Sequence, residues 1–177
     1  MEKSKPRVIL SGAISVDGKI ATKTNDSKLS SQKDIQRLHK LRSSVDAILV
    51  GKNTVSRDNP LLTVRHVKGK NPIRIVLDSK GTIPRTSKIL QSSNKIHTII
   101  AVSKKITRKN LEKLEKFPVE IILTGNDSVN LKSLLKKLSK KKIKTILVEG
   151  GGTVNWEFVK QDLFDEIILT LSPFLVG

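Results

Sequence analysis

The most distinctive candidate for chemistry is a run of three glycines at 150–152, preceded by Glu149 and followed by Thr153. A strand-like apolar stretch leads into this run, and a helix-like stretch leaves it. Such a turn presents bare N–H groups at the positive end of a helix, which suits phosphate binding, and glycine lets a ligand approach the backbone closely. The spacing matches neither G-x-G-x-x-G nor a P-loop. Taken alone, the stretch is equally consistent with a phosphate cradle and with a tight structural turn.

Acidic residues stand at the ends of two apolar runs. Glu149 closes the run at 145–148, and Asp78 closes the run at 73–77. If both runs are parallel strands, the two carboxylates lie on the same edge of the sheet, where α/β proteins bind their ligands. A third acid, Asp17, lies in the sequence SVDGKIAT, where the Asp-Gly pair indicates a turn. Each acid could be an ordinary exposed carboxylate. The expected presence of both Glu149 and Asp78 at one edge of the sheet, however, favours a ligand-binding site there.

Two arginines are candidates for binding a phosphate group. Arg42 lies near the end of a predicted helix, and Arg65 closes the sequence NPLLTVR. A guanidinium can bind phosphate through two parallel hydrogen bonds, although a lone arginine on a helix is more often on the surface. The three histidines lack the spacing of metal ligands, and we expect no metal site.

Composition narrows the classes of function. The 177 residues fit one domain, and 34 Lys and Arg against 16 Asp and Glu give a net charge of +18, which attracts anions such as nucleic acid or phosphorylated small molecules. Aromatic residues make up only 3%, so stacking platforms for single-stranded nucleic acid are not expected. The absence of cysteine excludes disulfides and the cysteine-dependent zinc deaminase signature. With no membrane-length apolar run and no signal sequence, we expect a cytoplasmic protein.

Short apolar runs recur along the chain, with helical patterns between them. Most runs are continuous, as expected of strands buried on both faces of a parallel sheet. Ser31 and Asn130 stand where helix N-caps belong, and leucines follow each at helical spacing. The alternation predicts one α/β domain, with a long polar loop from about 52 to 72 that is a candidate for function. The predicted strands are 7–16, 45–51, 73–78, 97–102, 119–125, 145–150 and 166–176, and the predicted helices are 31–44, 107–117, 130–142 and 153–161.

In this order the motifs resemble one family. The chain is similar to the riboflavin-pathway reductases in the sequences SVDGKIAT, LHKLRSSVDAILVGKNTVSRDNPLLTVR, NPIRIVLDSKG, ILVEGGGTVNWEFV and DEIILTLSPFLVG. This family comprises the stand-alone archaeal and fungal 2,5-diamino-6-ribosylamino-4(3H)-pyrimidinone 5′-phosphate reductases and the C-terminal reductase domain of the bifunctional bacterial deaminase–reductases. The resemblance extends from Val8 to Gly177.

The resemblance implies a dihydrofolate-reductase-like fold, with a mostly parallel central sheet flanked by helices. It also implies NADPH-dependent reduction of the ribose of that pyrimidinone phosphate to the ribitylamino product, with NADH as the alternative cofactor and the deaminated pyrimidine as the alternative substrate. Ser27, Arg42 and Arg65 would take the 5-phosphate, and Lys80 is a candidate for the 2′-phosphate of NADPH. The implied cofactor contacts are Thr54, Asp58, Asp78, Ser79, Lys80, Gly81, Gly150, Gly151, Gly152 and Thr153, and the implied substrate contacts are Ser27, Arg42, Leu62, Arg65 and Glu149.

Other features stay open at this level. The proton donor could be Glu149, Asp17 or an ordered water. The resemblance implies a homodimer and a single reductase domain over 1–177, which would continue into an antiparallel segment. Two further functions compete: a reductase of the same fold for another pyrimidine or pterin, and a non-enzymatic nucleotide- or RNA-binding protein favoured by the high charge. The arginines and Ser27 argue against both.

Overall fold

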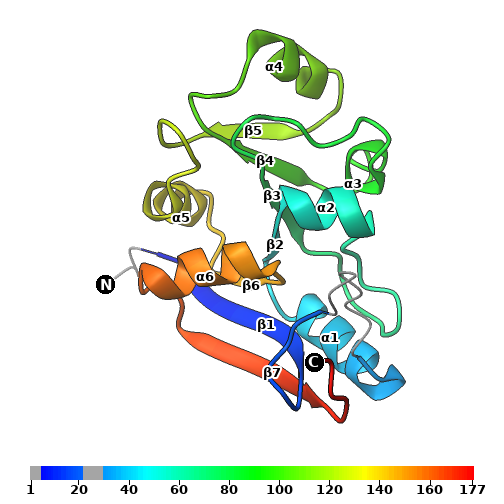
Figure 1. Ribbon diagram of the computed structural model, residues 1–177. Coiled ribbons are helices and arrows are strands. Elements are labelled where there is room, and N and C mark those ends of the chain that lie inside the picture. The colour runs from blue at the N-terminus through cyan, green and yellow to red at the C-terminus, as the bar shows by residue number, and fades with distance from the viewer. Residues whose placement is uncertain (1–4, 22–29) are drawn as a thin grey trace.

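The computed structural model describes residues 5–21 and 30–177. A seven-stranded sheet, parallel throughout, runs through these residues in the order β5-β4-β3-β2-β6-β1-β7 (Figure 1). The predicted α/β domain with a mostly parallel sheet is therefore confirmed, whereas the antiparallel continuation stays a prediction. Each predicted strand is present with slightly tighter bounds: β1 (Arg7–Ser15), β2 (Ala47–Gly51), β3 (Ile73–Leu77), β4 (Thr98–Val102), β5 (Glu120–Leu123), β6 (Thr145–Val148) and β7 (Glu166–Ser172).

The four predicted helices are also present, and their N-caps explain where they begin. The side chain of Ser31 accepts a hydrogen bond from the Asp34 N–H, and that of Asn130 accepts one from the Ser133 N–H. These bonds satisfy N–H groups that have no acceptor within a helix. The helices are α1 (Gln32–Ser43), α4 (Arg108–Glu115), α5 (Leu131–Lys140) and α6 (Gly152–Lys160).

Two further helices, α2 (Lys52–Asp58) and α3 (Lys88–Gln91), correct the sequence-based prediction. The region from about 52 to 72 was predicted as loop, but its first seven residues form α2. The sequence KNTVSRD has no apolar stripe, and Val55 is the residue of α2 that is buried in the core. Contacts with β2 and β3, rather than helical periodicity, hold this short helix in place.

Helices cover both faces of the sheet. One face packs against α5 and α6 through the leucines of α5 and Phe158 of α6. The other face packs against α1, α2, α3 and α4, with Val55, Ile89 and Leu114 in its core. Strands between two such layers must be apolar on both sides, which is why the central runs are continuous rather than alternating. The outermost strand β7 differs, because Ile167, Leu169 and Leu171 are 46%, 55% and 65% exposed.

Arg74 of β3 is a buried cation whose hydrogen bonds link several separate segments of the chain. Its side chain is fully buried, and burial lowers its pKa to about 10. The guanidinium donates to the hydroxyl of Thr98 and to the carbonyls of Leu61 and Ile89 at 2.7–3.2 Å. These bonds satisfy a buried cation that would otherwise be costly, and they secure the chain immediately before Leu62.

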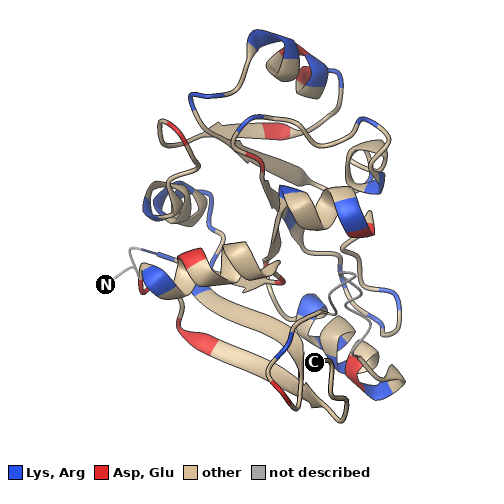
Figure 2. Ribbon diagram, viewed as in Figure 1, with Lys and Arg blue, Asp and Glu red and all other residues tan. Residues whose placement is uncertain are grey.

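The positive charge is spread over the molecule. Lys and Arg lie on the helices and loops around the fold, while the strands are mostly uncharged (Figure 2). Within 5–21 and 30–177, no helix has both the length and the apolar character needed to cross a bilayer, and no group of three or more His, Asp or Glu side chains could hold a metal ion.

Candidate active site

The glycine turn lies at the carboxyl edge of the sheet, between β6 and α6. Gly150 has φ +89°, a region that favours glycine, and the peptide bond from Gly150 to Gly151 is cis. Helix α2 packs against the turn: the Gly151 N–H donates to Thr54 Oγ1 at 2.9 Å, and the Gly51 N–H donates to the Gly150 carbonyl at 2.8 Å. The turn is therefore held on one side by the helix that the sequence did not predict.

A cavity of about 480 Å³ opens beside this turn, a size that suits a small-molecule ligand. The N–H groups of Gly152 and Thr153 begin α6 and have no acceptor within the helix. Lys52, Arg57 and Lys80 add positive charge around the opening. The cavity thus combines free N–H groups with cations, which suits an anionic ligand. It is lined by Gly51, Lys52, Asn53, Thr54, Arg57, Leu77, Asp78, Ser79, Lys80, Thr82, Gly151, Gly152, Thr153 and Val154.

The segment after β3 forms one wall of this cavity. Asp78 is 2% exposed, and its carboxylate accepts from the Ile83 N–H at 2.8 Å and from the Thr82 hydroxyl at 3.3 Å. Gly81 takes φ +65°, and its N–H donates to the Asp78 carbonyl. Asp78 therefore shapes the turn that carries Ser79 and Lys80 to the cavity.

A second cavity, of about 280 Å³, adjoins the first, and both are lined by Thr54, Arg57, Gly151 and Gly152. Its walls are richer in carboxylates, and Glu149 and Asp34 are among them. Burial by itself would raise the pKa of Asp34, but hydrogen bonds from Ser30, Thr170 and Arg37 outweigh it and lower that pKa. The cavity is lined by Ser11, Gly12, Ala13, Ile20, Ala21, Ser30, Asp34, Arg37, Leu38, Thr54, Arg57, Asp58, Glu149, Gly150, Gly151, Gly152 and Asn155.

Glu149 and Arg42 form a buried ion pair at this second cavity. Arg42 donates from Nε and Nη2 to the two carboxylate oxygens of Glu149 at 2.7 and 2.6 Å. The side chains are 9% and 11% exposed. Arg42 also donates from Nη1 to the Thr63 carbonyl at 3.1 Å. The expectation that a lone helical arginine is more often on the surface is wrong here, because Glu149 and Thr63 compensate its burial.

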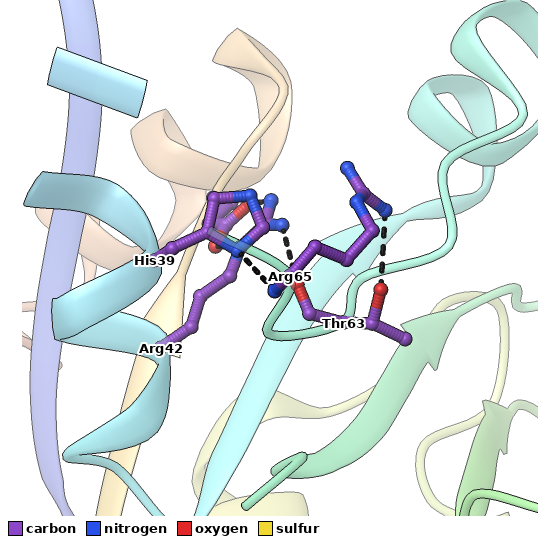
Figure 3. A network of polar contacts seen from close by, with 5 residues as sticks. His39, Arg42, Thr63 and Arg65 are labelled. Carbon is purple, nitrogen blue, oxygen red and sulfur yellow. Dashed lines mark hydrogen bonds and ion pairs between the residues drawn. The ribbon is translucent and has the colours of Figure 1, made fainter. Parts of the chain in front are cut away.

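The segment from Thr63 to Arg65 is held against α1 by polar contacts (Figure 3). The Arg65 N–H donates to Nδ1 of His39 at 3.0 Å. The Arg65 side chain is exposed, and its Nη1 donates to Thr63 Oγ1 at 3.1 Å. Burial, followed by the nearby positive charges of Arg42 and Arg65, lowers the pKa of His39 to about 4. Arg65 therefore presents an accessible guanidinium on a backbone that is held firmly.

The family of the chain follows from a sequence comparison. The family model described as RibD C-terminal domain matches residues 6–177. The chain belongs to the RibD C-terminal domain family. A protein of Aquifex aeolicus named 2,5-diamino-6-ribosylamino-4(3H)-pyrimidinone 5′-phosphate reductase is 39% identical over 98% of this chain and 79% of its own length. A protein of the same name from Methanothermobacter thermautotrophicus is 38% identical over 98% of this chain and 80% of its own length.

A solved structure agrees with this RibD C-terminal domain in fold. The Thermotoga maritima diaminohydroxyphosphoribosylaminopyrimidine deaminase/5-amino-6-(5-phosphoribosylamino)uracil reductase matches with a TM-score of 0.82 and 31% identity, over 99% of this chain and 47% of that one. The chain thus spans about four-fifths of the two single-name reductases and about half of the deaminase/reductase. The resemblance to the riboflavin-pathway reductases and their fold is confirmed.

The remaining predicted site residues differ in whether they line one of the two cavities. Asp58 ends α2, pairs with Arg57 at 2.7 Å and lines the second cavity. Leu62 has φ +52° and is buried in the core, with 2% of its surface exposed. Five predicted site residues line neither cavity, and Ser27 lies outside the described residues. The five are Asp17, Arg42, Leu62, Arg65 and Gly81.

Asp17 takes part in a turn rather than in the cleft. Its carboxylate accepts from the N–H groups of Val176 and Gly177 at 3.1 and 2.9 Å. Hydrogen bonds from Ser15, Val176 and Gly177 lower the pKa of Asp17 to about 2. Glu149, which lines the second cavity, is the better placed of the two candidate acids.

Sequence reasoning missed several residues of the cleft. Lys52 and Arg57 line it because α2 carries them there, and a recognised helix at 52–58 would have revealed both. Asn155 and Arg37 line the second cavity from α6 and α1. No local pattern distinguishes these two from ordinary polar residues on a helix surface.

Proposed function

We propose that this protein reduces the ribose of 2,5-diamino-6-ribosylamino-4(3H)-pyrimidinone 5′-phosphate to the ribitylamino product, using NADPH, in riboflavin biosynthesis. Two relatives at 38–39% identity carry the name of that reductase. The observation that carries the proposal is the pair of adjoining cavities that meet at Thr54 and the glycine turn. A dinucleotide and a phosphorylated substrate both need anion-binding groups: Lys52 and Lys80 line the first cavity, Arg37 lines the second, and Arg57 lines both. A cytoplasmic location is part of the same proposal.

The residues of the first cavity fit a nicotinamide dinucleotide. A β-carbon on Gly151 would lie 3.4 Å from Thr54 Oγ1, the atom that accepts from the Gly151 N–H, so the turn and α2 are in close contact here. The first N–H groups of α6 would hold phosphate oxygens, and Lys80, with Lys52 beside the same cavity, would hold the 2′-phosphate that distinguishes NADPH from NADH. When bound, NADPH supplies the hydride for the reduction.

The second cavity would hold the substrate. Arg65, together with Ser27, would bind the 5-phosphate through charge-assisted hydrogen bonds. Glu149 would accept hydrogen bonds from the ribose or pyrimidine while Arg42 holds its carboxylate in place. Arg42 uses three of its five N–H groups on protein acceptors and lines neither cavity, so its part would be to hold Glu149 rather than the 5-phosphate that the resemblance implies. The proton for the opening ribose ring would come from a water held beside Glu149, because both oxygens of this carboxylate accept hydrogen bonds from Arg42.

We also propose that the protein is a homodimer. Ile167, Leu169 and Leu171 lie on alternate positions of the edge strand β7, so their exposed side chains share one face of the sheet. Exposed apolar groups that cluster in this way mark interaction surfaces. A monomer by light scattering, with no change of state on Leu169→Lys substitution, would contradict the proposal.

A single assay tests the proposed reaction. The protein is incubated with NADPH and the ribosylaminopyrimidine phosphate, and oxidation is followed as loss of reduced-nicotinamide absorbance. The deaminated analogue and dihydrofolate are measured in parallel, because they represent the competing substrates. Oxidation that depends on the diaminopyrimidine phosphate is expected. No oxidation with it, or faster oxidation with dihydrofolate, would refute the proposal.

Substitution of Arg65 tests the proposed phosphate contact. Arg65→Ala should raise KM for the substrate by about tenfold to a hundredfold, because a charge-assisted hydrogen bond is worth about 1.5–3 kcal/mol. The KM for NADPH should change little. Arg108→Ala is the matched control, since Arg108 on α4 has a side chain that is 92% exposed. Equal losses of affinity for both ligands would contradict the assignment.

A further inference from the structure

Helix α1 buries three polar side chains, which is unusual for a helix packed on a sheet. Asp34, His39 and Arg42 are 8%, 2% and 7% exposed. Burying polar groups is unfavourable unless each is hydrogen-bonded. Asp34 has a partner in Thr170, and Arg42 has partners in Glu149 and Thr63. The partner of His39 is different in kind, because it is the backbone of a proposed substrate-binding residue.

His39 contacts the backbone of Arg65 through one ring nitrogen. Its Nδ1 accepts from the Arg65 N–H at 3.0 Å, and the ring of His66 lies edge-on at 4.6 Å between centroids. A ring nitrogen accepts a hydrogen bond only when it carries no proton. The lowered pKa of His39, caused first by burial and then by Arg42, Arg65 and His66, keeps the ring neutral at physiological pH. Nδ1 is thus the acceptor and Nε2 carries the proton.

Arg42 reaches the same segment one helical turn later. Residues three apart lie on one face of a helix, so His39 and Arg42 act together on the chain from Thr63 to Arg65 (Figure 3). The Thr63 carbonyl is held by Arg42, the Arg65 N–H by His39, and the Arg65 guanidinium by Thr63 Oγ1. The carbonyl before Arg65, the Arg65 N–H and the Arg65 guanidinium thus each have a hydrogen bond within this segment or to α1.

We propose that His39 is a positioning residue for substrate binding, which fixes the Arg65 backbone through Nδ1 so that its guanidinium meets the substrate phosphate in one orientation. Thr63 also orients Arg65, because its Oγ1 accepts a hydrogen bond from the guanidinium. The inference rests on the proposed function, in which Arg65 binds the phosphate. Its physical basis is pre-organisation: a side chain that is already oriented loses less freedom when the ligand binds. Neither residue needs to touch the substrate.

Two paired substitutions separate this role from a general loss of stability. The amide oxygen of asparagine can take the place of Nδ1, whereas that of glutamine lies nearer the position of Nε2. His39→Gln should raise KM for the ribosylaminopyrimidine phosphate by about tenfold, because an unpaired buried N–H weakens the segment. Its kcat and its KM for NADPH should change by less than about twofold, and His39→Asn should restore most of the loss. Thr63→Val should raise the same KM by about threefold, and Thr63→Ser should restore it.

A second measurement does not depend on activity. Hydrogen exchange of the Arg65 amide, followed by NMR, should be slow in the wild type and in His39→Asn, and fast in His39→Gln. If the wild type fails to oxidise NADPH, the proposed function fails, and the exchange rates still test whether Nδ1 holds the segment. Equal exchange in the two His39 variants would overturn the inference. So would parallel losses of kcat and of affinity for both ligands in His39→Asn and His39→Gln.

Discussion

Replacing Arg42 with methionine tests how strongly the buried ion pair joins α1 to the end of β6. Arg42 and Glu149 meet at 2.6 and 2.7 Å with side chains that are 9% and 11% exposed. Removing Arg42 leaves a buried carboxylate without its partner, which costs about 3–5 kcal/mol. It also leaves the Thr63 carbonyl without its donor, which adds about 1 kcal/mol. We therefore expect Arg42→Met to lower the free energy of unfolding by about 4–6 kcal/mol.

The double variant Arg42→Met with Glu149→Leu separates the cost of the unpaired carboxylate from the cost of the lost hydrogen bond to Thr63. It removes both charges, so its stability should return to within about 1–2 kcal/mol of the wild type, even though activity is lost. The assay is urea denaturation, because guanidinium chloride would screen the charges being measured. Arg108→Met is the control, since its exposed pair with Glu112 should be worth less than about 1 kcal/mol. A loss for Arg42→Met no larger than this control, or a double variant as unstable as the sum of both single variants, would refute the reasoning.

Three further predictions concern separate parts of the fold. Thr54→Val removes the acceptor of the Gly151 N–H and should cost about 1 kcal/mol in urea denaturation while weakening NADPH binding measured by calorimetry; unchanged stability and affinity would contradict this. Arg74→Met leaves buried carbonyls without donors and should cost about 3 kcal/mol or more; a loss below about 1 kcal/mol would show that these bonds are dispensable. His39 has a folded pKa of about 4, below its ordinary value of 6.5, so its unfolded form binds more protons between these values. Stability should therefore fall as pH drops from about 6.5 toward 4, and His39→Asn should lose this part of the pH dependence; identical profiles would contradict the assignment.

The strands and most helices could be predicted because their residues carry the pattern locally. A strand buried on both faces needs a continuous apolar run, and β2 and β4 consist almost entirely of such residues. Helix α5 shows its leucine stripe and its Asn130 cap within a dozen residues. Helix α2 was missed because it buries only Val55 in the core, and its stability comes from the strands beside it.

The glycine turn could be recognised from its sequence, but its role could not be decided there. Three glycines at a strand–helix junction suit both a phosphate cradle and a tight turn. The cavity beside the turn favours the cradle, because Thr54 from α2 and Lys80 from the segment after β3 complete its walls. Those walls come from three separate stretches of chain, and no local pattern joins them.

Composition and local patterns were sufficient for the α/β class, the family resemblance and the position of Glu149 at a sheet edge. Tertiary structure decided that Arg42 is buried against Glu149, 107 residues away, and that His39 holds the backbone of Arg65. The physical reason is that periodicity and capping depend on neighbours within a few residues, whereas the burial and pairing of a polar side chain depend on which distant segments meet it. Strand β6 lies between β2 and β1 in the sheet, and this arrangement brings the carboxylate of Glu149 to the arginine that holds it.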